Sequence, residues 1–185
     1  MAPKQMKMKT NMKQNIINAL MAASLTLLVG CATQQQGAQN GNAGWVRWQK
    51  SAGGNGHYYK AVADNGVTWT QAEKFARVAG GYLACITSKE ENDFVFKLVN
   101  SPKFFNGNAS GPAIGGRQLD GSTEPGGGWC WVSGEPWNYS NWLPGQPDNW
   151  EGNEDRLQFC GPAATWNDVN RNNAVMRGYV IERDH

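Results

Sequence analysis

The chain has 185 residues, of which 17 are Lys or Arg and 15 are Asp or Glu. This length suits one domain with a substantial hydrophobic core and is short for two. Four of the basic residues, Lys4, Lys7, Lys9 and Lys13, lie at the very start, which leaves 13 basic against 15 acidic side chains in the rest of the chain. No basic patch or run remains after this start, so we expect no nucleic-acid partner.

The first 30 residues have the pattern of a secretory signal peptide, because the basic start precedes an apolar run from Ile16 to Val29. A membrane-spanning helix needs about 20 apolar residues, whereas this run is shorter and is interrupted by Asn18 and Ser24. The end of the run, LVGC from Leu28 to Cys31, resembles the bacterial lipobox. That resemblance implies that Cys31 is lipidated and becomes the first residue of the mature protein.

The remaining chain divides at Trp45. Residues 31–44 are mostly Gln, Asn, Gly and Ala without apolar periodicity, and we interpret them as the lipidated Cys and a flexible tether. Ala32 follows the Cys, and the absence of Asp there implies, by the same resemblance, an anchor in the outer membrane of a Gram-negative bacterium. Residues 45–185 are then a single domain.

The domain begins with a predicted β-hairpin followed by a helix. The segments WVRWQ (45–49) and HYYKAVA (57–63) have strand character, and a Gly-rich turn from Ala52 to Gly56 separates them. Thr70, with Glu73 three residues on, has the spacing of a capping box and predicts a helix from Thr70 to Ala79.

A short buried strand, a second helix and a final strand complete the predicted regular elements. YLACI (82–86) reads as the buried strand. Ser88, with Glu91 three residues on, opens a second helix that we expect to end near Asn100. The final strand is RGYVIER, at 177–183.

The stretch from Gly107 to Asn173 is different in character, since it is dense in Gly, Trp, Asn and Pro and has only short apolar runs. Two helices followed by a loop-rich β half predict an α+β domain. A loop region of this length inside a domain indicates a function or an additional constraint that holds it in place.

A bound ion would provide that constraint. The segment GQPDNWEGNED (145–155) concentrates oxygen-bearing side chains, and WND (166–168) adds two more. Hard cations such as calcium take about 6 to 8 oxygen ligands. Five side chains are candidate ligands, and three of them are formally negative: Gln146, Asp148, Glu154, Asn167 and Asp168.

Six segments in order resemble the C-type lectin-like domain: AEKFARVAGGYLACITSKEENDFV, AIGG, WVSGEPWNYSNW, GQPDNWEGNED, WND and GYVIE. The resemblance covers nearly all of Trp45 to Glu182 and implies a double-loop α+β fold of two helices and small antiparallel sheets. It also implies that the termini lie close together and that the long loop region binds calcium and sugar. The family's Gln-Pro-Asp tripeptide falls on Gln146 to Asp148, and its proline implies a cis bond before Pro147.

Gln-Pro-Asp members of this family usually prefer galactose or N-acetylgalactosamine, whereas Glu-Pro-Asn members prefer mannose. The resemblance therefore implies that calcium-dependent sugar binding uses Gln146, Asp148, Glu154 and Asn167. Trp150 stands where galactose-type members place an aromatic ring, although a Trp that merely covers the surface is the alternative. Only three residues separate Trp150 from Glu154, where many galactose binders have a longer glycine-rich stretch.

The cysteines depart from the family pattern. Ala76 and Ile181 stand where the family usually has a bonded pair of cysteines, and both members of its second usual bridge are also missing. Cys130 and Cys160 either form a substitute bridge or remain buried thiols. We expect Cys85 to be a small core residue.

A second, auxiliary calcium would use Asn149, Glu154 and Asp155, with Asp120 or Glu124. Five more aromatic side chains could form a sugar-stacking platform, but we expect Trp131 and Trp142 in the core, and only Trp137 is a candidate for exposure: Trp129, Trp131, Trp137, Tyr139 and Trp142. We predict no enzymatic activity: a glycosidase pair of Glu154 and Asp168 is less fitting than metal coordination beside so many amides. The main rival is a lectin-like module that binds protein, with calcium as a structural brace.

Overall fold

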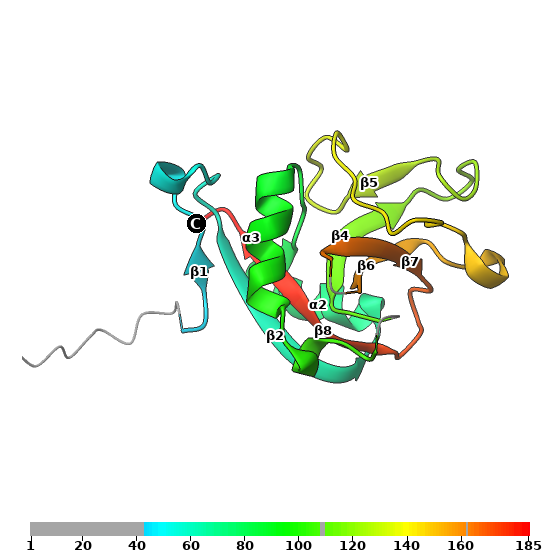
Figure 1. The fold of residues 1–185 in the computed structure, drawn as a ribbon, viewed down its shortest axis with the longest axis horizontal. Helices are drawn as coiled ribbons and strands as arrows, with labels where there is room; N and C mark the ends of the chain where they lie inside the picture. The colour runs from blue at the N-terminus through cyan, green and yellow to red at the C-terminus, as the bar shows by residue number, and fades with distance from the viewer. Residues whose placement is uncertain (1–42, 108–109, 162) are drawn as a thin grey trace, which may run out of the picture. The chain divides into compact units, whose positions relative to one another are not determined.

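A computed structural model describes residues 43–107, 110–161 and 163–185 (Figure 1). The interpreted signal peptide, Cys31 and nearly all of the tether lie outside the described residues. Within the described ranges, no helix is both long enough and apolar enough to cross a membrane.

The first strands and the last strand form one antiparallel group. β2 (Tyr58–Val67) pairs with β1 (Val46–Arg47) and with β8 (Met176–Arg183), and β3 (Tyr82–Leu83) pairs with β8. Tyr58 lies opposite both Arg47 and Arg183, so the start of the domain and its C-terminus are neighbours, as Figure 1 shows. The predicted hairpin and the predicted proximity of the termini are confirmed.

The first helix, α2 (Trp69–Val78), starts one residue earlier than predicted, and its predicted cap was wrong. Thr68 is the N-cap, and its capping box is completed by Gln71 rather than by Glu73. Trp69 is buried and donates its indole N–H to the Ile114 carbonyl at 2.9 Å, which places the first helical residue in the core. Thr70 instead donates its hydroxyl to the Arg171 carbonyl at 3.1 Å.

The second helix, α3 (Lys89–Val99), begins and ends as predicted. Ser88 accepts the Glu91 amide at 3.1 Å and so caps the helix. The Glu91 side chain does not complete a capping box, because its carboxylate turns inward to Thr87 and Tyr59. The α+β class is confirmed by two described helices and a mixed sheet.

The remaining strands form a second antiparallel group. β4 (Ala113–Gln118) pairs with β5 (Trp129–Trp131) and β6 (Arg156–Cys160), and β6 pairs with β7 (Thr165–Val169). One parallel register pair, Ala113 with Tyr179, joins the two groups into a single sheet. Short 3-10 helices are η1 (Lys50–Ala52), η2 (Pro102–Phe104) and η3 (Trp150–Gly152).

The core replaces the first of the two missing cysteine pairs by apolar packing. Ala76 of α2 and Ile181 of β8, at the positions of the missing family bridge, belong to the same buried cluster. Cys130 carries a free thiol, so the bridge between Cys130 and Cys160 is not formed. Cys85 is fully buried, as expected.

Several tryptophans pack together next to the long segment that connects β5 to β6. Figure 1 shows the course of that segment. Trp131 and Trp166 are buried, with ring centroids 5.6 Å apart. Trp137, the candidate for exposure, is partly buried, and its ring lies 4.4 Å from that of Trp131. Trp142, expected in the core, is partly buried at the edge of the same group.

Candidate metal and ligand site

Two of the predicted ligands, Asn167 and Asp168, lie on β7. Adjacent residues of a strand face opposite sides, so Asp168 shares the inner side with the buried Trp166. The Trp166 indole N–H donates to Asn92 of α3 at 2.8 Å and thereby fixes the strand against the helix. The helix thus determines where the two ligand positions lie.

The Asp168 carboxylate accepts hydrogen bonds from backbone amides of the long loop. Its Oδ1 accepts the Asp148 amide at 3.2 Å, and its Oδ2 accepts the Asn149 amide at 2.8 Å. These bonds follow the Gln146–Pro147 peptide, which is cis as predicted. A loop without strands is therefore fixed by one buried acid.

The loop then closes on itself between Asn149 and Glu154. The Asn149 Oδ1 accepts the Glu154 amide at 2.9 Å, and the Glu154 Oε2 accepts the Trp150 amide at 3.1 Å. Asn149 (φ 47°) and Glu151 (φ 57°) adopt left-handed backbone. Asn tolerates this conformation, whereas for Glu it costs roughly 1 kcal/mol. Strain of this kind is common in ligand-binding segments.

Three carboxylates converge in this loop. Oxygen atoms of Asp148, Glu154 and Asp168, here called the loop cluster, lie within 4.8 Å of one another. Burial, followed by the charge of Asp168, raises the pKa of Glu154 to about 7. Burial also raises the pKa of Asp168. Acids at this spacing destabilise one another unless a proton or a cation compensates the charge.

Two amide oxygens beside these acids in the sequence are left without partners. Gln146 Oε1 and Asn167 Oδ1 are buried and accept no hydrogen bond from any residue that the structure describes. Buried polar atoms are normally hydrogen-bonded, so both oxygens indicate a bound water or ion. Sequence reasoning had named both residues.

The donor set fits calcium. It offers carboxylate and amide oxygens without a nitrogen or sulfur ligand, which suits a hard cation and not zinc. Calcium accepts 6 to 8 such oxygens in a flexible geometry. The structure brings three of the five predicted side chains together, and the other two carry the unpaired oxygens. Their role as ligands remains a prediction.

Two of the acids considered for an auxiliary calcium, Asp120 and Asp155, form ion pairs with arginine. Arg171 forms ion pairs with Asp155 and, at 3.7 Å, with Asp120. Asp155 also lies 3.1 Å from the Arg156 guanidinium. These arginines pair with Oδ2 of Asp155, whereas its Oδ1 is buried and has no partner among the described residues, so the auxiliary calcium stays a prediction. Sequence reasoning missed Arg171, because its partners lie far from it in the chain.

Trp150 is 66% exposed at the start of η3. A Trp that served only to cover the core would bury more of its ring. Its backbone is held by Glu154 and by left-handed residues on either side, in place of a longer glycine-rich stretch. An aromatic face is thus presented to solvent next to the loop cluster.

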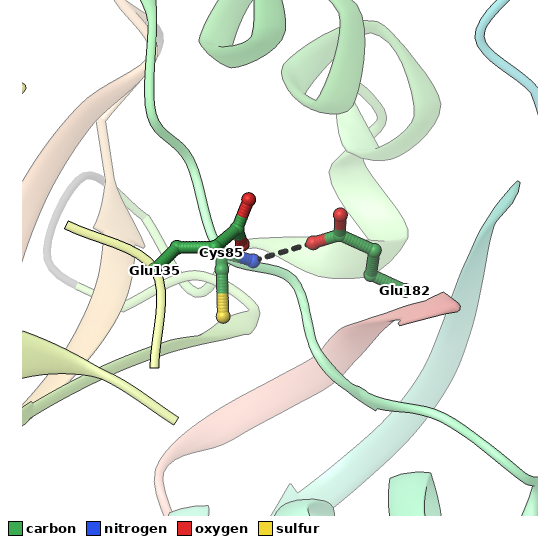
Figure 2. A group of neighbouring side chains, drawn as sticks. All are labelled: Cys85, Glu135 and Glu182. Carbon is green, nitrogen blue, oxygen red and sulfur yellow. Dashed lines mark hydrogen bonds between the residues drawn. The ribbon is translucent and has the colours of Figure 1, made fainter. Parts of the chain in front are cut away.

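A second group of ligand-bearing side chains, the core cluster, consists of Cys85, Glu135 and Glu182 (Figure 2). One ligand atom of each also lies within 4.8 Å of the others. Both oxygens of the buried Glu182, however, already have protein partners. Glu182 Oε1 lies 2.7 Å from His57 Nδ1 and accepts the Tyr59 hydroxyl at 3.1 Å. Glu182 Oε2 accepts the Cys85 amide at 2.8 Å, the dashed line in Figure 2.

Comparison with known families decides the fold family. The model of the Lectin C-type domain matches residues 65–177. The chain belongs to the C-type lectin family. Among solved C-type lectin structures, the carbohydrate-recognition domain of cow CD23 is similar, with a TM-score of 0.58 and 28% identity over 76% of this chain and 92% of that one. CEL-I from Cucumaria echinata, with a TM-score of 0.58 and 24% identity, covers 75% of this chain and 94% of that one and supports the fold alone.

Curated C-type lectins are also similar in sequence. C-type lectin domain family 10 member A of Homo sapiens is 32% identical over 131 residues, which cover 67% of this chain and 34% of that protein. Asialoglycoprotein receptor 2 of Mus musculus is 32% identical over 65% of this chain and 34% of that protein. The chain thus spans about a third of the length of these two relatives. Perlucin-like protein of Mytilus galloprovincialis is 34% identical over 75% of this chain and 80% of that protein.

Proposed function

We propose that this C-type lectin domain binds carbohydrate in a calcium-dependent manner at the loop cluster. The observation that carries the proposal is the pair of buried, unpaired oxygens on Gln146 and Asn167 beside three converging carboxylates. Family membership supports carbohydrate as the ligand class. Asialoglycoprotein receptor 2, a relative, is named for binding glycoproteins without sialic acid.

The residues proposed to hold calcium are Gln146, Asp148, Glu154, Asn167 and Asp168. When bound, calcium would offer open coordination positions to two neighbouring hydroxyls of a sugar. Asn167 already donates its amide N–H to the Asp168 carbonyl at 2.6 Å, which leaves its oxygen for the ion. Asp148 and Gln146 make no side-chain hydrogen bond within the described residues, so the acid can accept from one hydroxyl and the amide can donate to another.

The proposed sugar is galactose or N-acetylgalactosamine. The order of amide and acid around Pro147 is the one that galactose-type members carry. The exposed ring of Trp150 supports this choice, because the apolar face of galactose packs on aromatic rings. We infer binding without enzymatic activity, as is general in this family.

We further propose that Cys31 carries a lipid that anchors the domain in the bacterial outer membrane. Replacing the residue, Cys31→Ala, should release the protein from the membrane fraction. Continued sedimentation of the variant with membranes would contradict the anchor.

A glycan array probed with the full chain, with calcium and with a chelator, tests the proposed function. Calcium-dependent retention on galactose-terminated glycans is the expected result. No glycan retention, together with capture of a protein partner that ignores the chelator, would instead favour the protein-binding module.

A further inference from the structure

A hollow of about 260 Å³ lies beside Trp150. Trp150 and Glu151 line it together with Glu154, and the turn between β7 and β8 adds Asn170, Asn172 and Asn173. A second hollow, of about 320 Å³, shares Glu154, Asn170 and Asn172 with the first. The loop cluster therefore adjoins a larger concave surface through Glu154, a proposed ligand.

The hollow offers hydrogen-bond donors that the protein itself does not use. Each asparagine amide has two N–H donors, and the side-chain N–H groups of Asn170, Asn172 and Asn173 donate to no group in the described ranges. Ligand sites for sugars combine such groups with an aromatic face, and Trp150 provides that face. Glu151 supplies negative charge that no ion pair compensates within the described residues, so the hollow disfavours an acidic ligand.

The turn that carries these asparagines is held in place. The Asn170 Oδ1 accepts the Asn172 amide at 2.8 Å. The Arg171 carbonyl accepts both the amide and the hydroxyl of Thr70, at 3.2 and 3.1 Å, and the Arg171 guanidinium pairs with Asp155. A fixed turn loses little conformational entropy when a ligand binds.

We propose that the hollow between Trp150 and the turn from Asn170 to Asn173 is a subsite for a second, neutral sugar residue, adjacent to the sugar at the loop cluster. This inference rests on the proposed function of that cluster. The natural ligand is then an oligosaccharide and not a single terminal sugar. Asn172 and Asn173 donate to hydroxyls of the second residue.

Calorimetric titration of the full chain with methyl β-galactoside and with lactose, in calcium, tests the subsite. We expect lactose to bind about fivefold to tenfold more tightly, the increment that one or two hydrogen bonds give. Asn173→Ala, which removes no hydrogen bond of the described fold, should erase the increment and leave the affinity for methyl β-galactoside unchanged. Asn100→Ala, an exposed asparagine at the end of α3, is the matched control and should alter neither affinity.

Equal affinities for the two ligands in the unmodified protein would overturn the subsite and leave the proposed function intact. A lactose increment that survives Asn173→Ala combined with Asn172→Ala would also overturn it. If neither sugar binds, and methyl α-mannoside and mannobiose also fail, the proposed function itself is wrong and the subsite with it.

Discussion

The loop cluster and the core cluster are alike in ligand spacing and differ in the buried polar atoms beside them. Each places three potential ligand atoms within 4.8 Å. In the core cluster, both oxygens of the buried Glu182 have protein partners. Around the loop cluster, two buried amide oxygens have none among the described residues.

This difference shows that proximity of acids does not define a metal site. A buried carboxylate whose lone pairs meet protein donors is stable as part of a hydrogen-bond network. None of the three acids of the loop cluster forms an ion pair with a basic side chain within the described ranges, and two buried amide oxygens beside them are unpaired. This difference supports the proposal that calcium binds at the loop cluster and that the core cluster has a structural role.

The largest expected effect is the loss of ligand binding in Asp148→Ala. Asp148 makes no side-chain hydrogen bond in the described structure, so the fold should persist. Loss of an outer-shell partner alone typically weakens metal binding by about 10 to 100-fold, and loss of a ligand should cost at least as much. Calcium affinity and retention on galactose resin should both fall. Glu135→Gln in the core cluster is the matched control, and an equal loss there would remove the distinction between the clusters.

Glu182→Ala is expected to lower the stability of the fold by a large amount and to leave calcium binding unchanged. The change leaves the buried Cys85 amide without its acceptor and removes the partner of His57, whereas Tyr59 keeps Glu91 as an acceptor. We expect a loss of about 3 kcal/mol in the free energy of unfolding, measured in urea. Calcium affinity at a temperature where the variant is folded should be unchanged. The exposed Glu90→Ala variant should unfold like the unmodified protein.

A change of specificity, and not of calcium binding, is expected when acid and amide are exchanged in Gln146→Glu with Asp148→Asn. The exchange keeps the number of charges but swaps donor and acceptor around the sugar hydroxyls. Preference on a glycan array should move from galactose toward mannose. An unchanged profile would place specificity outside these two residues.

The smallest effect is a pH dependence of stability carried by the core cluster. Burial raises the pKa of Glu182 to about 7 from an ordinary value of 4.5. The pKa of His57 is also raised, because His57 is hydrogen-bonded to Glu182. The folded state therefore binds these protons more tightly than the unfolded chain, and the resulting stability, full below about pH 4.5, declines as pH rises through 7.

In a calcium-free buffer, the melting temperature should fall between pH 5 and pH 8, and less steeply in Glu182→Gln. The comparison with this variant isolates the core cluster, because Glu154 of the loop cluster contributes with the same sign. Parallel pH profiles for the two proteins would show that Glu182 does not carry the effect.

Features that depend on neighbouring residues were predictable from the sequence. Ser88 caps α3, since its hydroxyl and the amide it accepts are three residues apart. Pro147 and the five candidate ligands could be named, because a family motif fixes their order. The hairpin followed from its Gly-rich turn and its alternating strands.

Features that depend on distant contacts were not predictable. Thr68 and Thr70 both suit a helix start, and the burial of Trp69 together with the Arg171 carbonyl decides between them. The pairing of Arg171 with Asp155 joins residues 16 positions apart and brings a basic side chain to the acids considered for an auxiliary calcium. Such pairings follow from the folded geometry and leave no local signal.

Calcium titration of the unmodified full chain by calorimetry tests the central claim most directly. We expect one calcium ion per chain, with a dissociation constant of about 10⁻⁴ to 10⁻³ M as in extracellular calcium modules. The heat should vanish in Asp148→Ala and persist in Glu135→Gln. An absence of binding at about 10⁻² M calcium, or binding that Asp148→Ala leaves unchanged, would contradict the assignment of the ion to the loop cluster.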